Sequence, residues 1–145
     1  AILRVAALVP ALCLGSRTVT VERAATVPEL WRVRAPSHPE KLLELTFAVR
    51  QQNVNRLEDE LRRVSDPRSP GYGDHLSSHQ VHMLVAPRWA HVDAVMDFLR
   101  RHGVQGRAAT PNSDFIVADV TVAVAEWMLS TAYVRLAHNG SGLEV

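Results

Sequence analysis

Apolar residues stand at every second position from Leu43 to Val49, with more polar residues between them. This period of two predicts a strand with one buried face. From Val54 to Val64 the apolar residues instead recur three or four positions apart, separated by charged residues, which predicts an amphipathic helix. The helix must end by Asp66, because the proline at position 67 disfavours helical geometry in the residue before it.

Two more helices are predicted before the chain returns to strands. Ser77 and Gln80 have the spacing of a capping box, which opens a short helix over about 78–86. A longer apolar stripe begins at Trp89, and Gly103 follows it as a left-handed C-cap. We expect three large side chains of this part and of the later helix to lie in the core: Trp89, Met96 and Trp127.

The last third of the chain predicts a hairpin, a helix and a strand. Residues 104–110 and 114–120 flank Pro111-Asn112-Ser113, which has turn composition. Thr121 can cap a helix to about Ser130, and residues 133–136 give the final strand. The order of elements predicts an α+β fold, the ferredoxin-like split β-α-β-β-α-β antiparallel sandwich with an extra short helix, preceded by a signal segment.

Charge and composition exclude several classes of partner. The 145 residues are 47% hydrophobic, which suits a soluble domain with its own core. With 16 basic and 15 acidic residues the formal net charge is only +1, so the chain has no strong positive electrostatic potential that would attract nucleic acid or an anionic membrane. We therefore expect neither nucleic acid nor a membrane as a partner.

The N-terminal residues 1–15 combine Arg4 with an apolar run that is too short to span a bilayer. They match a truncated signal peptide, with Cys13 and Gly15 as small residues before a cut at Ser16; a buried strand or short core helix is the alternative. This interpretation predicts a secreted domain without thiols. It also makes Asn139, in the chain's Asn-x-Ser sequon, a glycosylation candidate.

The segment from Ser65 to Leu76 is a polar loop with two prolines, two glycines and one tyrosine. Its prolines fix φ, its glycines reach conformations closed to other residues, and its aspartate can form an Asx turn. The structural interpretation is a chain reversal after a helix. The functional interpretation is a rigid surface that fits a partner, since a preordered loop loses less entropy when it docks.

The loop and its flanks resemble the activation pro-domain of the sedolisins, the serine-carboxyl peptidases, and most of all the tripeptidyl-peptidase I group. The motif consists of LTFAVRQQN (45–53) and Ser65-Asp66-Pro67-x-Ser69-Pro70-x-Tyr72-Gly73-x-x-Leu76. The similarity extends back to Trp31 and forward to Phe115, and covers most of residues 31–136. The resemblance implies a pro-domain that helps its enzyme to fold, covers the active-site face and is removed in the acidic lysosome.

The resemblance assigns no catalytic residue and no cofactor to this chain, because the family's catalytic residues and calcium site belong to the catalytic domain. We thus expect a noncatalytic N-terminal part of a serine-type peptidase, with the catalytic domain as its partner in cis. The expected parts are a signal segment (1–15), an extended lead-in (16–42), the pro-domain (43–138) and the start of a linker (139–145). The expected interface residues are Trp31, Asp66, Pro67, Ser69, Pro70, Tyr72, Gly73 and Leu76.

Two other functions remain open at this level. One is a free-standing pro-domain-like inhibitor that acts in trans. The other is a small ferredoxin-like module that binds a metal or ligand, since fold alone does not select a function. His75, His79 and His82 lack the further ligands that a zinc site needs, so we interpret them as exposed helix residues or as pH sensors at an interface.

Overall fold

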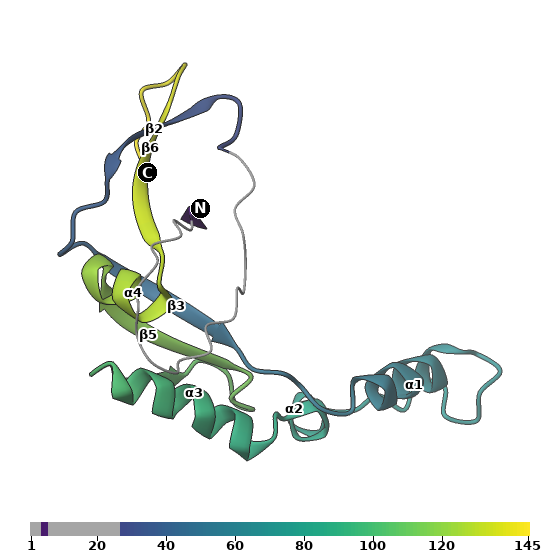
Figure 1. Ribbon diagram of the computed structural model, residues 1–145. Helices are drawn as coiled ribbons and strands as arrows, with labels where there is room; N and C mark the ends of the chain where they lie inside the picture. Colours follow the sequence, from purple (N-terminus) through teal and green to yellow (C-terminus); the bar gives the residue numbers. More distant parts are fainter. Residues whose placement is uncertain (1–3, 6–26) are drawn as a thin grey trace. The chain divides into compact units, whose positions relative to one another are not determined.

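The computed structural model describes residues 4–5 and 27–145 (Figure 1). Within this part, the chain forms two compact units. One unit contains residues 44–119, and the other contains the described residues up to 43 together with 120–145. We describe each unit separately.

The first unit is built on the sheet β3-β5-β4. Its strands are β3 (Leu42–Ala48), β4 (Arg107–Ala108) and β5 (Phe115–Thr121), of which β4 and β5 form the predicted antiparallel hairpin. Helix α3 (Trp89–Arg101) supplies buried side chains to this sheet. Leu99 of α3 is fully buried, and the Phe98 ring lies 6.4 Å from that of Phe47 on β3.

Two shorter helices precede α3, and the second of them has the N-terminal capping that its sequence predicts. Helix α1 (Val54–Ser65) packs against α2 (Ser78–Val85). The Ser77 hydroxyl accepts from the backbone N–H of Gln80, and the Gln80 side chain accepts from the backbone N–H of Ser77, so the capping box is confirmed. The Gly103 φ of 70° confirms the predicted left-handed turn after α3.

The second unit contains the sheet β1-β6-β2 and one helix. Its strands are β1 (Arg4–Val5), β2 (Trp31–Pro36) and β6 (Ala132–His138), and β6 pairs antiparallel with both neighbours. Helix α4 (Val122–Leu129) begins at Thr121, whose hydroxyl accepts from the Val124 N–H as predicted. Val122, Ala125 and Met128 form its buried face.

The described residues therefore have the predicted α+β fold, with two antiparallel sheets and four helices in a ferredoxin-like split β-α-β-β-α-β arrangement. In the sheet order β3-β5-β4, the third strand of that pattern (β5) lies between the first (β3) and the second (β4). The fourth strand, β6, pairs with β2, so part of the predicted extended lead-in is itself a strand.

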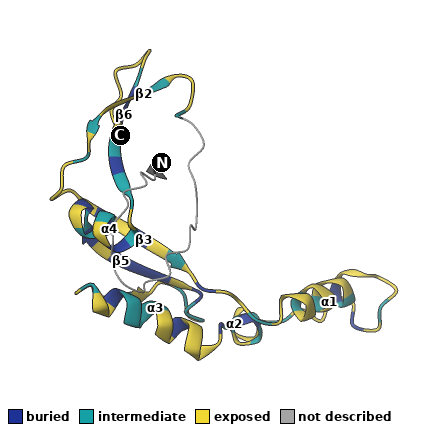
Figure 2. Cartoon of the chain, in the orientation of Figure 1, coloured by how far each residue is buried: buried dark blue, intermediate teal, exposed yellow. Residues whose placement is uncertain are grey.

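Burial of the large side chains differs from the prediction at several positions (Figure 2). The expectation that Trp89 and Trp127 lie in the core is wrong, because they are 73% and 66% exposed. Met96 is half-buried. Of the apolar stripe on α1, only Val64 is buried, and Leu61 is 63% exposed. Helical spacing shows which residues share a face, but it does not show whether a partner covers that face.

The predicted signal segment lies outside the described residues, apart from the two residues of β1. None of the helices in the described part of the chain is long and apolar enough to cross a membrane.

A buried carboxylate connects the hairpin to the end of β3. Asp114 is only 7% exposed, and its side chain accepts from the Thr110 hydroxyl at 2.5 Å and from the Gln51 amide at 2.6 Å. Its backbone carbonyl accepts from the Val49 N–H at 2.7 Å. Burial alone raises the pKa of Asp114, but hydrogen bonds from Thr110, Gln51 and Asn112 outweigh it, so the pKa lies below its usual value.

We expect Asp114→Asn to destabilise the fold by about 1–3 kcal/mol at neutral pH, because an amide cannot accept all of these hydrogen bonds. Folding lowers the pKa of Asp114. The ionised carboxylate therefore contributes its full stabilisation of the fold above the unfolded-state pKa of about 3.9, and this contribution is lost as the pH falls through the lower pKa of the folded state. Urea unfolding from pH 7 to 2 measures this. The variant should lose less stability in acid than the wild type, whereas Asp119→Asn, at an exposed position on β5, should behave like the wild type.

Candidate binding surface

Residues 66–76 connect α1 to α2, and we call them the α1–α2 loop. Its first half is a turn built by Asp66. The Asp66 carboxylate accepts from the Arg68 N–H at 2.9 Å, and the Asp66 carbonyl accepts from the Ser69 N–H at 2.9 Å. This is the Asx turn that the sequence predicts, with Pro67 fixing φ inside it.

The second half of the loop returns to the end of α1. The Ser69 hydroxyl accepts from the Gly71 N–H at 3.2 Å, and the Ser69 carbonyl accepts from the Tyr72 N–H at 3.1 Å. Gly73 then donates to the carbonyl of Val64 at 2.9 Å and has a φ of 77°, a region that favours glycine. The loop therefore closes on the helix from which it began.

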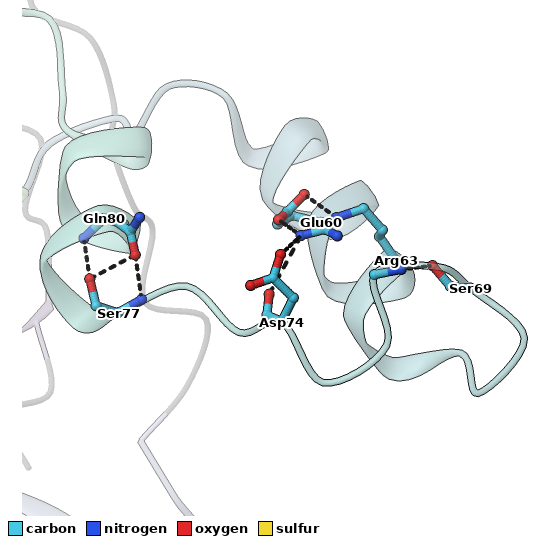
Figure 3. Close-up of polar contacts among 7 residues, drawn as sticks. Glu60, Arg63, Ser69, Asp74, Ser77 and Gln80 are labelled. Atoms are coloured by element: carbon cyan, nitrogen blue, oxygen red, sulfur yellow. Dashed lines mark hydrogen bonds and ion pairs between the residues drawn. The ribbon is translucent and has the colours of Figure 1, made fainter.

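Arg63 fixes the closed loop from the helix side (Figure 3). Its guanidinium contacts Glu60 at 2.6 Å, one turn back on α1, and Asp74 at 3.2 Å in the loop. The hydrogen bond to Glu60 has the largest effect on the pKa of Arg63 and the hydrogen bond to Asp74 the next largest, and both raise this pKa above its usual value. The hydrogen bond between Arg63 and Glu60 also lowers the pKa of Glu60. A side chain at Gly71 would collide with the guanidinium, since an ideal Cβ would lie 1.7 Å from the Arg63 Nη1.

Only part of this role of Arg63 can be read from the sequence. The spacing to Glu60 is helical and could have been read from the sequence. The contact with Asp74 crosses a loop, and no local pattern indicates it. Gly71, which leaves room for the guanidinium, was the available signal.

The predicted interface residues of the loop lie together and are mostly accessible. Tyr72 is 59% exposed although its backbone is hydrogen-bonded, so its ring faces solvent from a fixed position. The other loop positions divide into exposed ones (Asp66, Pro67, Pro70 and Gly73) and half-buried ones (Ser69 and Leu76). Trp31 belongs to the other unit, where it lies on β2 with its ring edge-on to His138 at 5.1 Å.

The three histidines proposed as pH sensors continue from this loop. His75 ends it, and His79 and His82 lie on α2; the first two are exposed and His82 is half-buried. Within residues 27–145, no hydrogen bond or ion pair involves their imidazoles. No cluster of three or more histidine, cysteine or acidic side chains in the described part of the chain could hold a metal ion.

An open groove of about 790 Å³ runs beside the first turn of α1. The polar residues that line it are Arg50, Gln51, Asn55 and Arg56. The phenyl ring of Phe115 and the methyl groups of Val54, both partly exposed, form an apolar part of its lining. No serine, cysteine or histidine lines it. The groove can therefore contact a partner, but its residues include no nucleophile paired with a base.

Comparison with known proteins identifies the family. Residues 29–144 match the model of the family described as "Pro-kumamolisin, activation domain", so the chain belongs to this family. It is 36% identical over 126 residues to tripeptidyl-peptidase sed1 of Aspergillus fumigatus, an alignment that covers 86% of this chain and 20% of that protein. With human tripeptidyl-peptidase 1 it is 36% identical over 111 residues, or 77% of this chain and 20% of that protein.

These comparisons confirm the resemblance to the sedolisin pro-domains, and in particular to those of tripeptidyl-peptidases. The chain spans about a fifth of the length of the relatives that it matches. The loop and the fold around it thus belong to an activation domain, and most of each relative lies outside the matched region.

We expect Arg63→Gln to loosen the α1–α2 loop, because the loop loses its side-chain link to α1. Native-state hydrogen exchange should show several-fold faster exchange at Tyr72 and Gly73, with little change in global stability, since exposed ion pairs contribute little to it. Arg62→Gln is the matched control, because the ion pairs of Arg62 within the described residues are with Glu58 and Asp59 on its own helix. Equal exchange in both variants would show that Arg63 does not hold the loop.

Proposed function

We propose that this chain is the pro-domain of a sedolisin-type, tripeptidyl-peptidase-like serine peptidase. It acts as an intramolecular chaperone and inhibitor whose partner is the catalytic domain of the same polypeptide. The observation that carries the proposal is the family match over residues 29–144, in relatives that are about five times as long as the matched segment. The calcium ion that the resemblance implies belongs to the catalytic domain.

The proposed mechanism is occlusion of the substrate cleft by a folded module. The α1–α2 loop supports it, because internal hydrogen bonds and Arg63 order the loop before any partner binds. Little conformational entropy is then lost on docking. Tyr72 presents an exposed ring from this fixed backbone, and aromatic side chains of this kind are common binding hot spots.

The proposed trigger for release is acid. His75, His79 and His82 lie at the end of the loop and on the adjoining helix α2, and imidazoles gain charge between neutral and mildly acidic pH. New positive charge at a packed interface weakens it. The proposed location is correspondingly the secretory pathway, with the lysosome as the acidic compartment.

The central test is inhibition in trans. Added to mature human tripeptidyl-peptidase 1 from which the natural propeptide has been removed, the chain should inhibit peptide hydrolysis near neutral pH and dissociate in acid. Surface plasmon resonance between pH 7 and 4.5 would measure the binding directly. No inhibition and no binding at neutral pH would refute the proposed function.

We expect Tyr72→Ala to weaken this inhibition by about tenfold or more, as truncation of an aromatic hot spot does. Inhibition constants and circular dichroism should be measured together, because the variant must remain folded. Trp89→Ala is the matched control, since Trp89 is also a strongly exposed aromatic residue but lies on α3. Full inhibition by the Tyr72 variant would remove the loop from the interface.

We expect the triple change of His75, His79 and His82 to Gln to move dissociation to lower pH, because the interface then gains less charge in acid. The pH profile of the dissociation rate measures this shift. His91→Gln, at an exposed position on α3, provides the control. A profile identical to that of the wild type would exclude these three side chains as the pH sensors.

A further inference from the structure

The turn that follows β6 is organised around one imidazole. The Nδ1 atom of His138 accepts from the backbone N–H groups of Gly140 and Ser141, both at 3.2 Å, and lies 3.1 Å from the Ser141 hydroxyl. Because two backbone donors point at Nδ1, this atom carries the lone pair, and the ring proton resides on Nε2. The Trp31 ring packs edge-on against the same imidazole.

The backbone of the same turn is fixed on both sides. The Asn139 N–H donates to the carbonyl of Leu30 at 2.9 Å, and the His138 N–H donates to that of Leu143 at 2.9 Å. Asn139 and Gly140 are exposed, and the Asn139 carboxamide makes no hydrogen bond among the described residues. A reactive asparagine-glycine pair therefore lies beside a fixed base.

Asparagine followed by glycine has a characteristic side reaction. The backbone nitrogen of the glycine can attack the asparagine carboxamide, because no side chain on the glycine hinders the approach. The attacking nitrogen must lose its proton. In this chain the proton on the Gly140 nitrogen already points at His138 Nδ1, within the distance at which a general base operates.

We propose that Asn139 is a site of spontaneous deamidation and that His138 is its general base. The Gly140 nitrogen forms a bond to the Asn139 Cγ while its proton passes to His138 Nδ1. The bond between Cγ and Nδ2 then breaks, and the leaving nitrogen departs as ammonia after taking a proton from the imidazolium. Water opens the resulting succinimide to aspartate or isoaspartate, and no oxidant or cofactor is required.

The modification has two consequences for this turn. It adds a negative charge, and the isoaspartate product also adds a backbone carbon to a tightly hydrogen-bonded turn. It also competes with glycosylation, because both reactions use the same Nδ2 atom of Asn139. A chain that carries a glycan at Asn139 is protected, and an unglycosylated chain is converted irreversibly. This inference does not depend on the proposed inhibitory function.

The test is peptide mass spectrometry of the unglycosylated chain incubated at neutral pH and 37 °C. The folded chain should deamidate Asn139 faster than a synthetic peptide of residues 134–145, in which His138 is not fixed. His138→Gln should slow the reaction in the folded chain by about tenfold or more, and should change it little in the peptide. His91→Gln is the control, and Gly140→Ala should suppress the reaction.

The result that overturns the proposal is equally direct. If Asn139 deamidates more slowly in the folded chain than in the peptide, the hydrogen bond to His138 protects the turn instead of activating it. Because this comparison uses only the wild-type sequence, it holds even if the His138 variant loses its fold. Equal rates in the wild type and a folded His138 variant would likewise exclude His138 as the base.

Discussion

The buried carboxylate of Asp114 is the interaction on which the first unit depends. It collects hydrogen bonds from the hairpin turn through Thr110 and from the segment after β3 through Gln51, while its backbone pairs with Val49. The start of β5 and the end of β3 are thereby joined at one point. A buried carboxylate is unfavourable without such partners, so the sheet register and the hydrogen bonds stabilise each other.

The surface proposed to bind the catalytic domain follows a different physical rule. The α1–α2 loop buries little, and its order comes from turns, from a glycine with positive φ and from the Arg63 guanidinium. Such contacts contribute little to global stability but restrict the loop to one shape. These properties of the loop suit the proposed role of an inhibitor that is later released, because the loop can dock with a small entropic cost and detach without unfolding the core.

Local patterns were sufficient to predict most elements and the family. The capping residues Ser77, Thr121 and Gly103 each have a short-range mechanism, and the structure confirms all three. Burial was harder to predict. Trp89 and Trp127 are exposed although their size suggested the core, because hydrophobicity shows what a side chain prefers and not whether another element reaches it.

The sequence by itself determined the four helices of the described residues, the strands from β3 onward, the Asx turn in the loop and membership of the activation-domain family, since each depends on residues close together in the chain or on a motif. Only the tertiary structure decided that Arg63 reaches Asp74, that Asp114 is buried beneath Gln51 and Thr110, and that β2 pairs with β6. These contacts join residues up to about a hundred positions apart in the chain. Such contacts form together because each one stabilises the others in the folded state, so no local sequence pattern indicates any one of them.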